Sequence, residues 1–204
     1  MLYVTIGAQV AVGLVFLSAA VSKCRSRRAL AVFRDAFSQL VPRLRRHAAA
    51  IAAAVVTLEW ATVVLIAVPG TALAGLAMAD AILIVFTAVL ASALRRGVAT
   101  PCRCLGASDR PVSAVHVVRN GLLIAVATPG LAAAIVGGPS KISLVGGVVA
   151  AVAGVLVALG AMVLDDVVEL FSDATPASDG YSPRVVASET TPRVSTEGDT
   201  WPSS

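Results

Sequence analysis

Charged residues are scarce in this sequence of 204 residues. Only 14% of the residues are Asp, Glu, Lys or Arg, and 57% are hydrophobic, whereas a soluble domain carries about 25% charged residues. Apolar runs of roughly 20 residues, the length that a helix needs to cross a bilayer, recur along the chain. The composition therefore excludes an ordinary soluble domain and predicts a polytopic membrane protein.

Cysteine is also scarce, and familiar cofactor motifs are missing. Three cysteines are too few for a fold held together by disulfides, and one pair with one lone thiol suits redox chemistry better. No nucleotide, flavin or haem motif is visible, so we predict no bound cofactor. The alternating pattern of a barrel strand is absent, and backbone groups in lipid must be paired within their own segment. We therefore predict an all-α fold.

Five apolar runs predict a polytopic membrane helical bundle with four core transmembrane helices and a fifth. The predicted spans cover residues 2–22, 48–68, 71–94, 113–136 and 141–164. We expect the first run to be a span and not a cleaved signal peptide, because no basic residue precedes it. Residues 1–170 then form the transmembrane domain. Residues 171–204 are rich in Ser, Thr, Pro, Asp and Glu, which predicts a disordered tail.

A basic connector joins the first two spans, over residues 23–47. Its apolar residues recur at three- and four-residue steps, at Leu30, Phe33, Phe37, Leu40 and Val41. This spacing predicts an amphipathic helix that lies in the membrane interface. A solvated loop attracted to anionic lipid is the alternative.

Several polar side chains fall inside the predicted spans. Lys23 ends the first span, Glu59 lies near the middle of the second, and Asp80 lies in the third. The first two turns of the fourth span carry His116, Arg119 and Asn120, which share one helix face. An ionisable residue at bilayer depth is costly and indicates a functional site. A structural ion pair between Glu59 and a cation on another helix explains this residue equally well.

The most reactive candidate is a dithiol loop between the third and fourth spans. Cys102 and Cys104 flank Arg103, and nearby arginines favour the reactive thiolate form of both side chains. A disulfide between thiols so close in sequence would be strained, which makes it a labile oxidant or shuttle and not a permanent link. His116 is a candidate proton acceptor for a thiol.

Other interpretations of the cysteine pair stay open. A zinc site needs four ligands at characteristic spacings, and Cys24, Cys102, Cys104 and His116 would supply them only by coincidence, so we predict no metal site. A protease-like nucleophile needs a base and an orienting group, and nothing points to them. Two inert cysteines in a loop are the remaining alternative.

The distribution of charge bears on topology and partners. Residues 23–119 contain 13 basic and 4 acidic residues, and the basic ones lie mainly between the spans. This pattern indicates membrane topology and no nucleic-acid partner. The positive-inside rule places the dithiol loop in the cytoplasm, whereas disulfide formation requires an oxidising compartment. Both placements stay open.

Taken in order, these features resemble the MauE family, membrane proteins associated with methylamine utilisation within a wider DoxX-like group of four-helix proteins. The resemblance covers about residues 10–135. It rests on Phe16-Leu17-Ser18-Ala19 through Ser22-Lys23, Phe33 and Phe37, Glu59, Arg96-Gly97, Cys102-Arg103-Cys104-Leu105-Gly106, and Arg119-Asn120. Leu105 departs from the Phe that is usual in the family, and the fifth span and the tail extend beyond its core.

The resemblance implies that the protein helps an extracytoplasmic partner to mature, by assisting disulfide formation. Cys102 and Cys104 would carry the redox chemistry, and Lys23, Glu59, Arg119 and Asn120 would form the polar set that organises the bundle. The expected partners are the lipid bilayer, a secreted or periplasmic client and a quinone or thioredoxin-like electron acceptor. The alternative is a non-catalytic membrane scaffold or transport helper, in which the intramembrane charges have a structural role.

Overall fold

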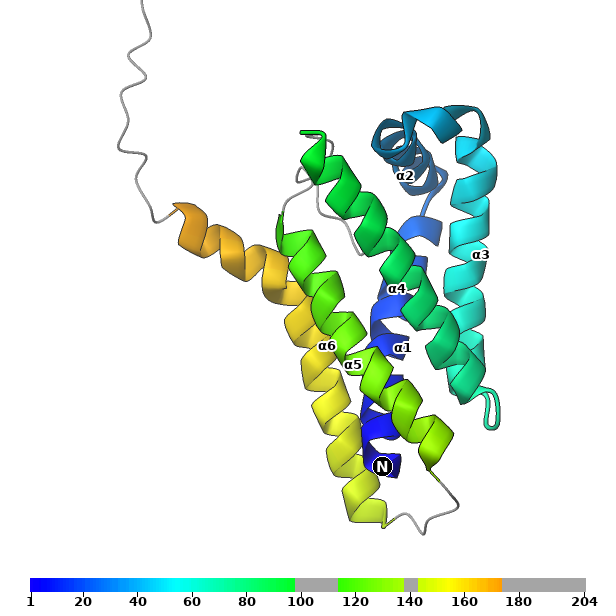
Figure 1. Ribbon diagram of the computed structural model, residues 1–204, viewed down its shortest axis with the longest axis vertical. Helices are drawn as coiled ribbons and strands as arrows, with labels where there is room; N and C mark the ends of the chain where they lie inside the picture. Colours follow the sequence, from blue (N-terminus) through cyan, green and yellow to red (C-terminus); the bar gives the residue numbers. More distant parts are fainter. Residues whose placement is uncertain (98–113, 138–142, 174–204) are drawn as a thin grey trace, which may run out of the picture.

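The computed structural model describes residues 1–97, 114–137 and 143–173, with side chains placed up to residue 164 in the last range. The helices are α1 (Leu2–Cys24), α2 (Arg27–Leu40), the 3-10 helix η1 (Pro42–His47), α3 (Ala48–Ala67), α4 (Ala72–Arg95), α5 (Ala114–Val136) and α6 (Leu144–Asp173). The described residues contain no strand. The prediction of an all-α bundle is confirmed (Figure 1).

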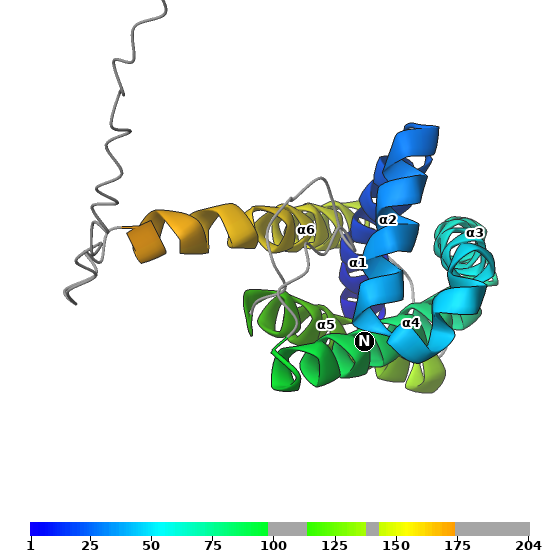
Figure 2. The ribbon, with the colours of Figure 1, turned by 90° about the horizontal axis from the view of Figure 1, so that it is seen from above.

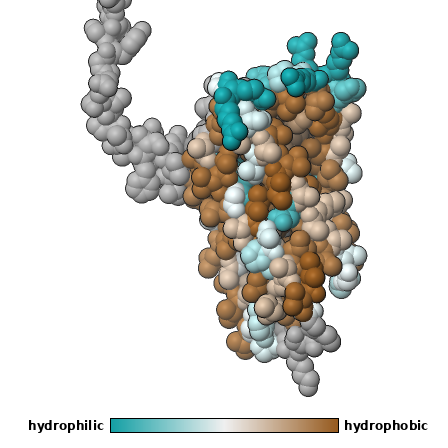
Figure 3. Space-filling model, in the orientation of Figure 1, coloured by the Kyte–Doolittle hydropathy of each residue, from teal (hydrophilic) through white to brown (hydrophobic). Residues whose placement is uncertain are grey.

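Five segments, which contain α1, α3, α4, α5 and α6, are long and apolar enough to cross a membrane. The prediction of a multi-pass membrane protein is thereby confirmed. The face of the molecule shown in Figure 3 is largely hydrophobic along the bundle, and hydrophilic side chains gather at the end that carries α2. Helix α6 continues to Asp173, past the predicted end of its span. The tail from residue 174 lies outside the described residues, so its disorder stays a prediction.

Helix α1 lies at the centre of the bundle and packs against α3, α5 and α6, while α4 packs against α3 and α5 (Figures 1 and 2). The main core contains Val12, Val15 and Phe16 of α1, with Leu83 of α4 and Leu123 of α5. Glycine allows two of these helices to approach α1 closely. Gly154 of α6 lies against the Gly7 carbonyl, and Gly130 of α5 lies against Ala8.

The basic connector forms the predicted amphipathic helix, but its apolar face packs on protein and not on lipid. Ser26 caps α2, and its Oγ accepts a hydrogen bond of 3.0 Å from the Ala29 amide. Phe33 and Leu40 are buried in a second core. Their partners in this core are Ala52 of α3 with Leu90 and Ala93 of α4. Helix α2 therefore closes one end of the bundle, over the end of α1 (Figure 2).

The close approach of α6 to α1 can be tested by adding a single methyl group. In the variant Gly154→Ala, the new Cβ would collide with the Gly7 carbonyl. We expect a destabilisation of about 1–3 kcal/mol, as for other overpacked cores. Gly160→Ala is the matched control on the same helix, because a Cβ there meets no atom within 4 Å. Thermal unfolding of the purified proteins in detergent measures both, and equal midpoints would contradict the close packing.

Candidate functional site

A buried ion pair joins α1 to α3. The Lys23 ammonium lies 2.7 Å from Glu59 Oε1, and the two side chains are only 2% and 4% exposed. Lys23 Nζ also donates a hydrogen bond of 3.4 Å to the Ala19 carbonyl, and it lies 5.0 Å from the centre of the Phe33 ring. Helix α2 thus covers the pair with an aromatic ring, which favours a cation at this position.

The pair lies at different heights on its two helices. Glu59 is the twelfth residue of the 20-residue helix α3, so it lies about 16 Å from the start of that helix. Lys23 is the second-last residue of the 23-residue helix α1, so on that helix the pair lies at the end. Each charge alone would be very costly to bury inside this apolar bundle, and the partner compensates much of that cost.

Helix α5 carries three buried polar side chains, and one of them, Asn120, lies beside the pair. His116, Arg119 and Asn120 are buried, with exposures of 2%, 4% and 1%. Asn120 and Glu59 line one small cavity of about 20 Å³ together with Phe16 and other apolar residues, which is space for about one water molecule. Among the described residues, Glu59 Oε2 and Asn120 Oδ1 have no hydrogen-bond partner. The structure therefore brings Lys23, Glu59 and Asn120 together from three helices.

Asp80 has a different environment from the other predicted polar residues. Its two carboxylate oxygens accept hydrogen bonds of 3.3 and 3.2 Å from the Thr128 hydroxyl. Thr128 follows Asn120 by eight residues on α5, a rise of about 12 Å. Within the described part of the chain, Asp80 is bonded to Thr128 and not to the Lys23–Glu59 pair. The sequence did not point to Thr128, because a hydroxyl inside an apolar run carries no charge signal.

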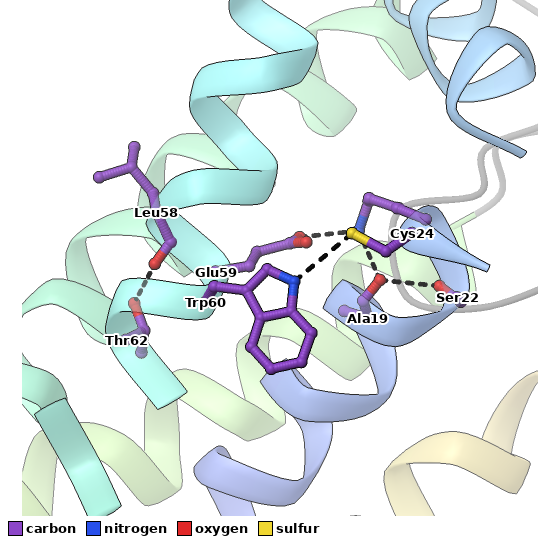
Figure 4. Close-up of polar contacts among 8 residues, drawn as sticks. Ala19, Ser22, Cys24, Leu58, Glu59, Trp60 and Thr62 are labelled. Atoms are coloured by element: carbon purple, nitrogen blue, oxygen red, sulfur yellow. Dashed lines mark hydrogen bonds and ion pairs between the residues drawn. The ribbon is translucent and has the colours of Figure 1, made fainter. Parts of the chain in front are cut away.

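A third thiol lies beside the ion pair. Trp60 Nε1 donates a hydrogen bond of 3.4 Å to Cys24 Sγ. Figure 4 shows Glu59 and Trp60 extending from α3 toward the end of α1 that carries Cys24. Cys24 is exposed and free. Sequence reasoning gave no partner for this thiol, since Trp60 is 36 residues away along the chain.

The dithiol residues Cys102 and Cys104 lie outside the described residues, but the helices on each side of their loop are placed. Helix α4 ends at Arg95 and α5 begins at Ala114, both toward the end of the bundle that α2 closes (Figure 1). The Arg96 guanidinium donates a hydrogen bond to the Leu40 carbonyl, which ties the start of the loop to the end of α2. Among the described side chains, no group of three or more His, Cys, Asp or Glu could hold a metal ion.

Comparison with known proteins identifies the family. A family model described as methylamine utilisation protein MauE matches residues 1–135. The chain belongs to the MauE family. No curated protein and no solved structure matches it significantly. The MauE region contains the Lys23–Glu59 pair, Asn120 and the dithiol loop, and it ends one residue before the end of α5. Helix α6 is an addition to this region, packed on α1.

The cost of breaking the buried ion pair in this MauE protein can be compared with that of an exposed pair. Glu59→Gln removes the charge that compensates Lys23, and we expect a loss of about 3–5 kcal/mol in the free energy of unfolding. Asp35→Asn is the matched control, because Asp35 pairs with Arg34 on the surface, where the two side chains are 61% and 47% exposed. Its expected loss is below about 1 kcal/mol.

The double variant Lys23→Met/Glu59→Leu distinguishes the effect of losing the ion pair from the effect of leaving one buried charge without its partner. Since it removes both charges and keeps apolar volume, we expect it to be more stable than Glu59→Gln. The free energy of unfolding of all three purified variants is measured in mixed detergent micelles of increasing denaturing strength. A Glu59→Gln variant as stable as Asp35→Asn would show that the buried pair does not stabilise the fold.

Proposed function

We propose that this MauE-family protein assists the maturation of an extracytoplasmic client by thiol–disulfide exchange at Cys102 and Cys104. The observation that supports this proposal is the anchoring of the loop on both sides. Arg96 is bonded to the end of α2 just before the loop, and His116, Arg119 and Asn120 are buried just after it. A loop whose two flanking helices are packed in a bundle can present two thiols to a protein partner at the membrane surface.

The proposed reaction moves two electrons from the client to the loop. A client thiolate attacks the Cys102–Cys104 disulfide and forms a mixed disulfide, and a second client thiolate then displaces the loop cysteine. The client gains a disulfide, and Cys102 and Cys104 become thiols. A quinone or the disulfide of a thioredoxin-like protein then accepts two electrons and two protons and restores the loop disulfide. His116, in the first turn of α5, is the proposed proton acceptor.

A second function, a non-catalytic membrane scaffold, is favoured by a different observation. The Lys23–Glu59 pair joins two helices and is buried by a third, which is the arrangement expected of a charge with a structural role. In a scaffold, the cysteines could be replaced without effect, while the loss of Glu59 would be damaging because Lys23 would stay buried without its partner.

The redox state and the location of the loop can be tested together in intact cells. In a Cys24→Ser variant, we expect a membrane-impermeant maleimide to label the loop from outside only after reduction, because the proposed disulfide faces an oxidising compartment. The triple variant that also carries Cys102→Ser and Cys104→Ser is the control and should not be labelled. Labelling that requires permeabilised membranes and proceeds equally without reductant would favour the scaffold.

The proposed shuttle also has an expected reduction potential. We expect the purified Cys24→Ser protein, titrated in glutathione redox buffers, to show a Cys102–Cys104 couple more oxidising than about −270 mV, the range of catalytic dithiols. A strained small ring favours the dithiol and raises the potential. Alkylation followed by mass analysis measures the oxidised fraction. A potential below about −300 mV, typical of structural disulfides, would contradict a shuttle.

A further inference from the structure

An apolar groove lies on the outside of the bundle, between α3 and α4 and below the junction of α2 with η1. Its volume is about 490 Å³, within the range of about 300–1,000 Å³ that is typical of ligand pockets. One wall is formed by Ile51, Val55 and Leu58 of α3, and the upper edge by Phe37, Val41 and Leu44. Every lining residue is apolar, so the groove suits a hydrocarbon chain.

The groove extends for the depth of one membrane leaflet. On α4 its wall runs from Met78 to Val89, which is about 16 Å of helix. Half of a hydrocarbon core is about 15 Å. With the end at Leu44 at the membrane surface, where the headgroup of a lipid would lie, the end at Met78 would reach about the middle of the bilayer.

Three exposed arginines are neighbours of the groove residue Leu44 in the sequence. Leu44 lines the groove, and its neighbours on η1 are Arg43, Arg45 and Arg46, all exposed. No acidic residue occurs between residues 36 and 58. This end of the molecule is hydrophilic where the bundle below it is hydrophobic (Figure 3). Guanidinium groups bind phosphate oxygens in pairs of parallel hydrogen bonds, so the charge complements an anionic headgroup.

We propose that this groove is a binding site for one anionic glycerophospholipid. An acyl chain lies between α3 and α4, and the phosphate binds the arginines of η1. The lipid supports the junction of α2 with η1, and α2 in turn covers the Lys23–Glu59 pair through Phe33. This site is separate from the proposed thiol chemistry, because it uses no cysteine.

The test measures lipid binding to the full chain, purified in detergent. Phosphatidylglycerol, phosphatidylcholine with the same acyl chains, and inorganic phosphate are added separately, and the midpoint of thermal unfolding and the bound lipid in native mass spectra are recorded. We expect phosphatidylglycerol to raise the midpoint and to be retained in preference to phosphatidylcholine. Stabilisation by inorganic phosphate equal to that by phosphatidylglycerol would overturn the proposal, because the acyl chain would then contribute nothing.

Two pairs of variants test the two halves of the site. The triple variant Arg43→Gln/Arg45→Gln/Arg46→Gln should lower the preference for phosphatidylglycerol at least about fivefold. The matched control, Arg25→Gln/Arg27→Gln/Arg28→Gln, removes the same charge at the other end of α2 and should keep the preference. An equal loss in both variants would indicate diffuse attraction to the membrane surface and would overturn the proposal.

The groove itself is tested by filling it. Val85 lines the groove and is 62% exposed, and Val152 of α6 lies elsewhere on the surface with a similar exposure of 52%. We expect Val85→Trp to abolish retention of phosphatidylglycerol, and Val152→Trp to leave it unchanged. If both variants retain the lipid as well as the parent, the acyl chain does not occupy the groove and the proposal fails.

Discussion

The arrangement of the bundle depends on the ion pair between Lys23 and Glu59. Neither charge could be buried inside an apolar bundle without the other, so the pair fixes how α1 lies against α3. Lys23 is the second-last residue of α1, whereas Glu59 lies beyond the middle of α3. Helix α1 therefore ends well below the start of α3. The space above it is filled by the apolar face of α2, which explains why an amphipathic helix buries Phe33 in protein and not in lipid.

Close packing of small residues positions helices α5 and α6 against α1. Gly7 and Ala8 allow α6 and α5 to approach closely, through Gly154 and Gly130. Helices in lipid associate through close backbone contact of this kind, because the hydrophobic effect does not drive them together there. The additional helix α6 packs on the same central helix, α1, as the helices of the MauE region.

The features relevant to chemistry and binding lie toward one end of the molecule. This end carries the helix ends that flank the dithiol loop, the amphipathic helix α2 and the arginines of η1 (Figure 1). Arg96 connects two of these features through the Leu40 carbonyl. The proposed thiol chemistry would require the loop to meet a client at the membrane surface, and the proposed lipid between α3, α4 and η1 would stabilise the helices at this end.

The sequence by itself determined the all-α membrane fold, the five spans and the polar residues inside them. Span length and hydropathy follow directly from the thickness of the bilayer, and Lys23, Glu59 and Asn120 are conspicuous in apolar runs. Only the tertiary structure decided which of these residues meet. It paired Lys23 with Glu59, gave Asp80 to Thr128, and turned the apolar face of α2 toward the protein. Contacts between residues 36 or 48 positions apart depend on how whole helices are offset along one another, and the pattern within a single helix does not contain that offset.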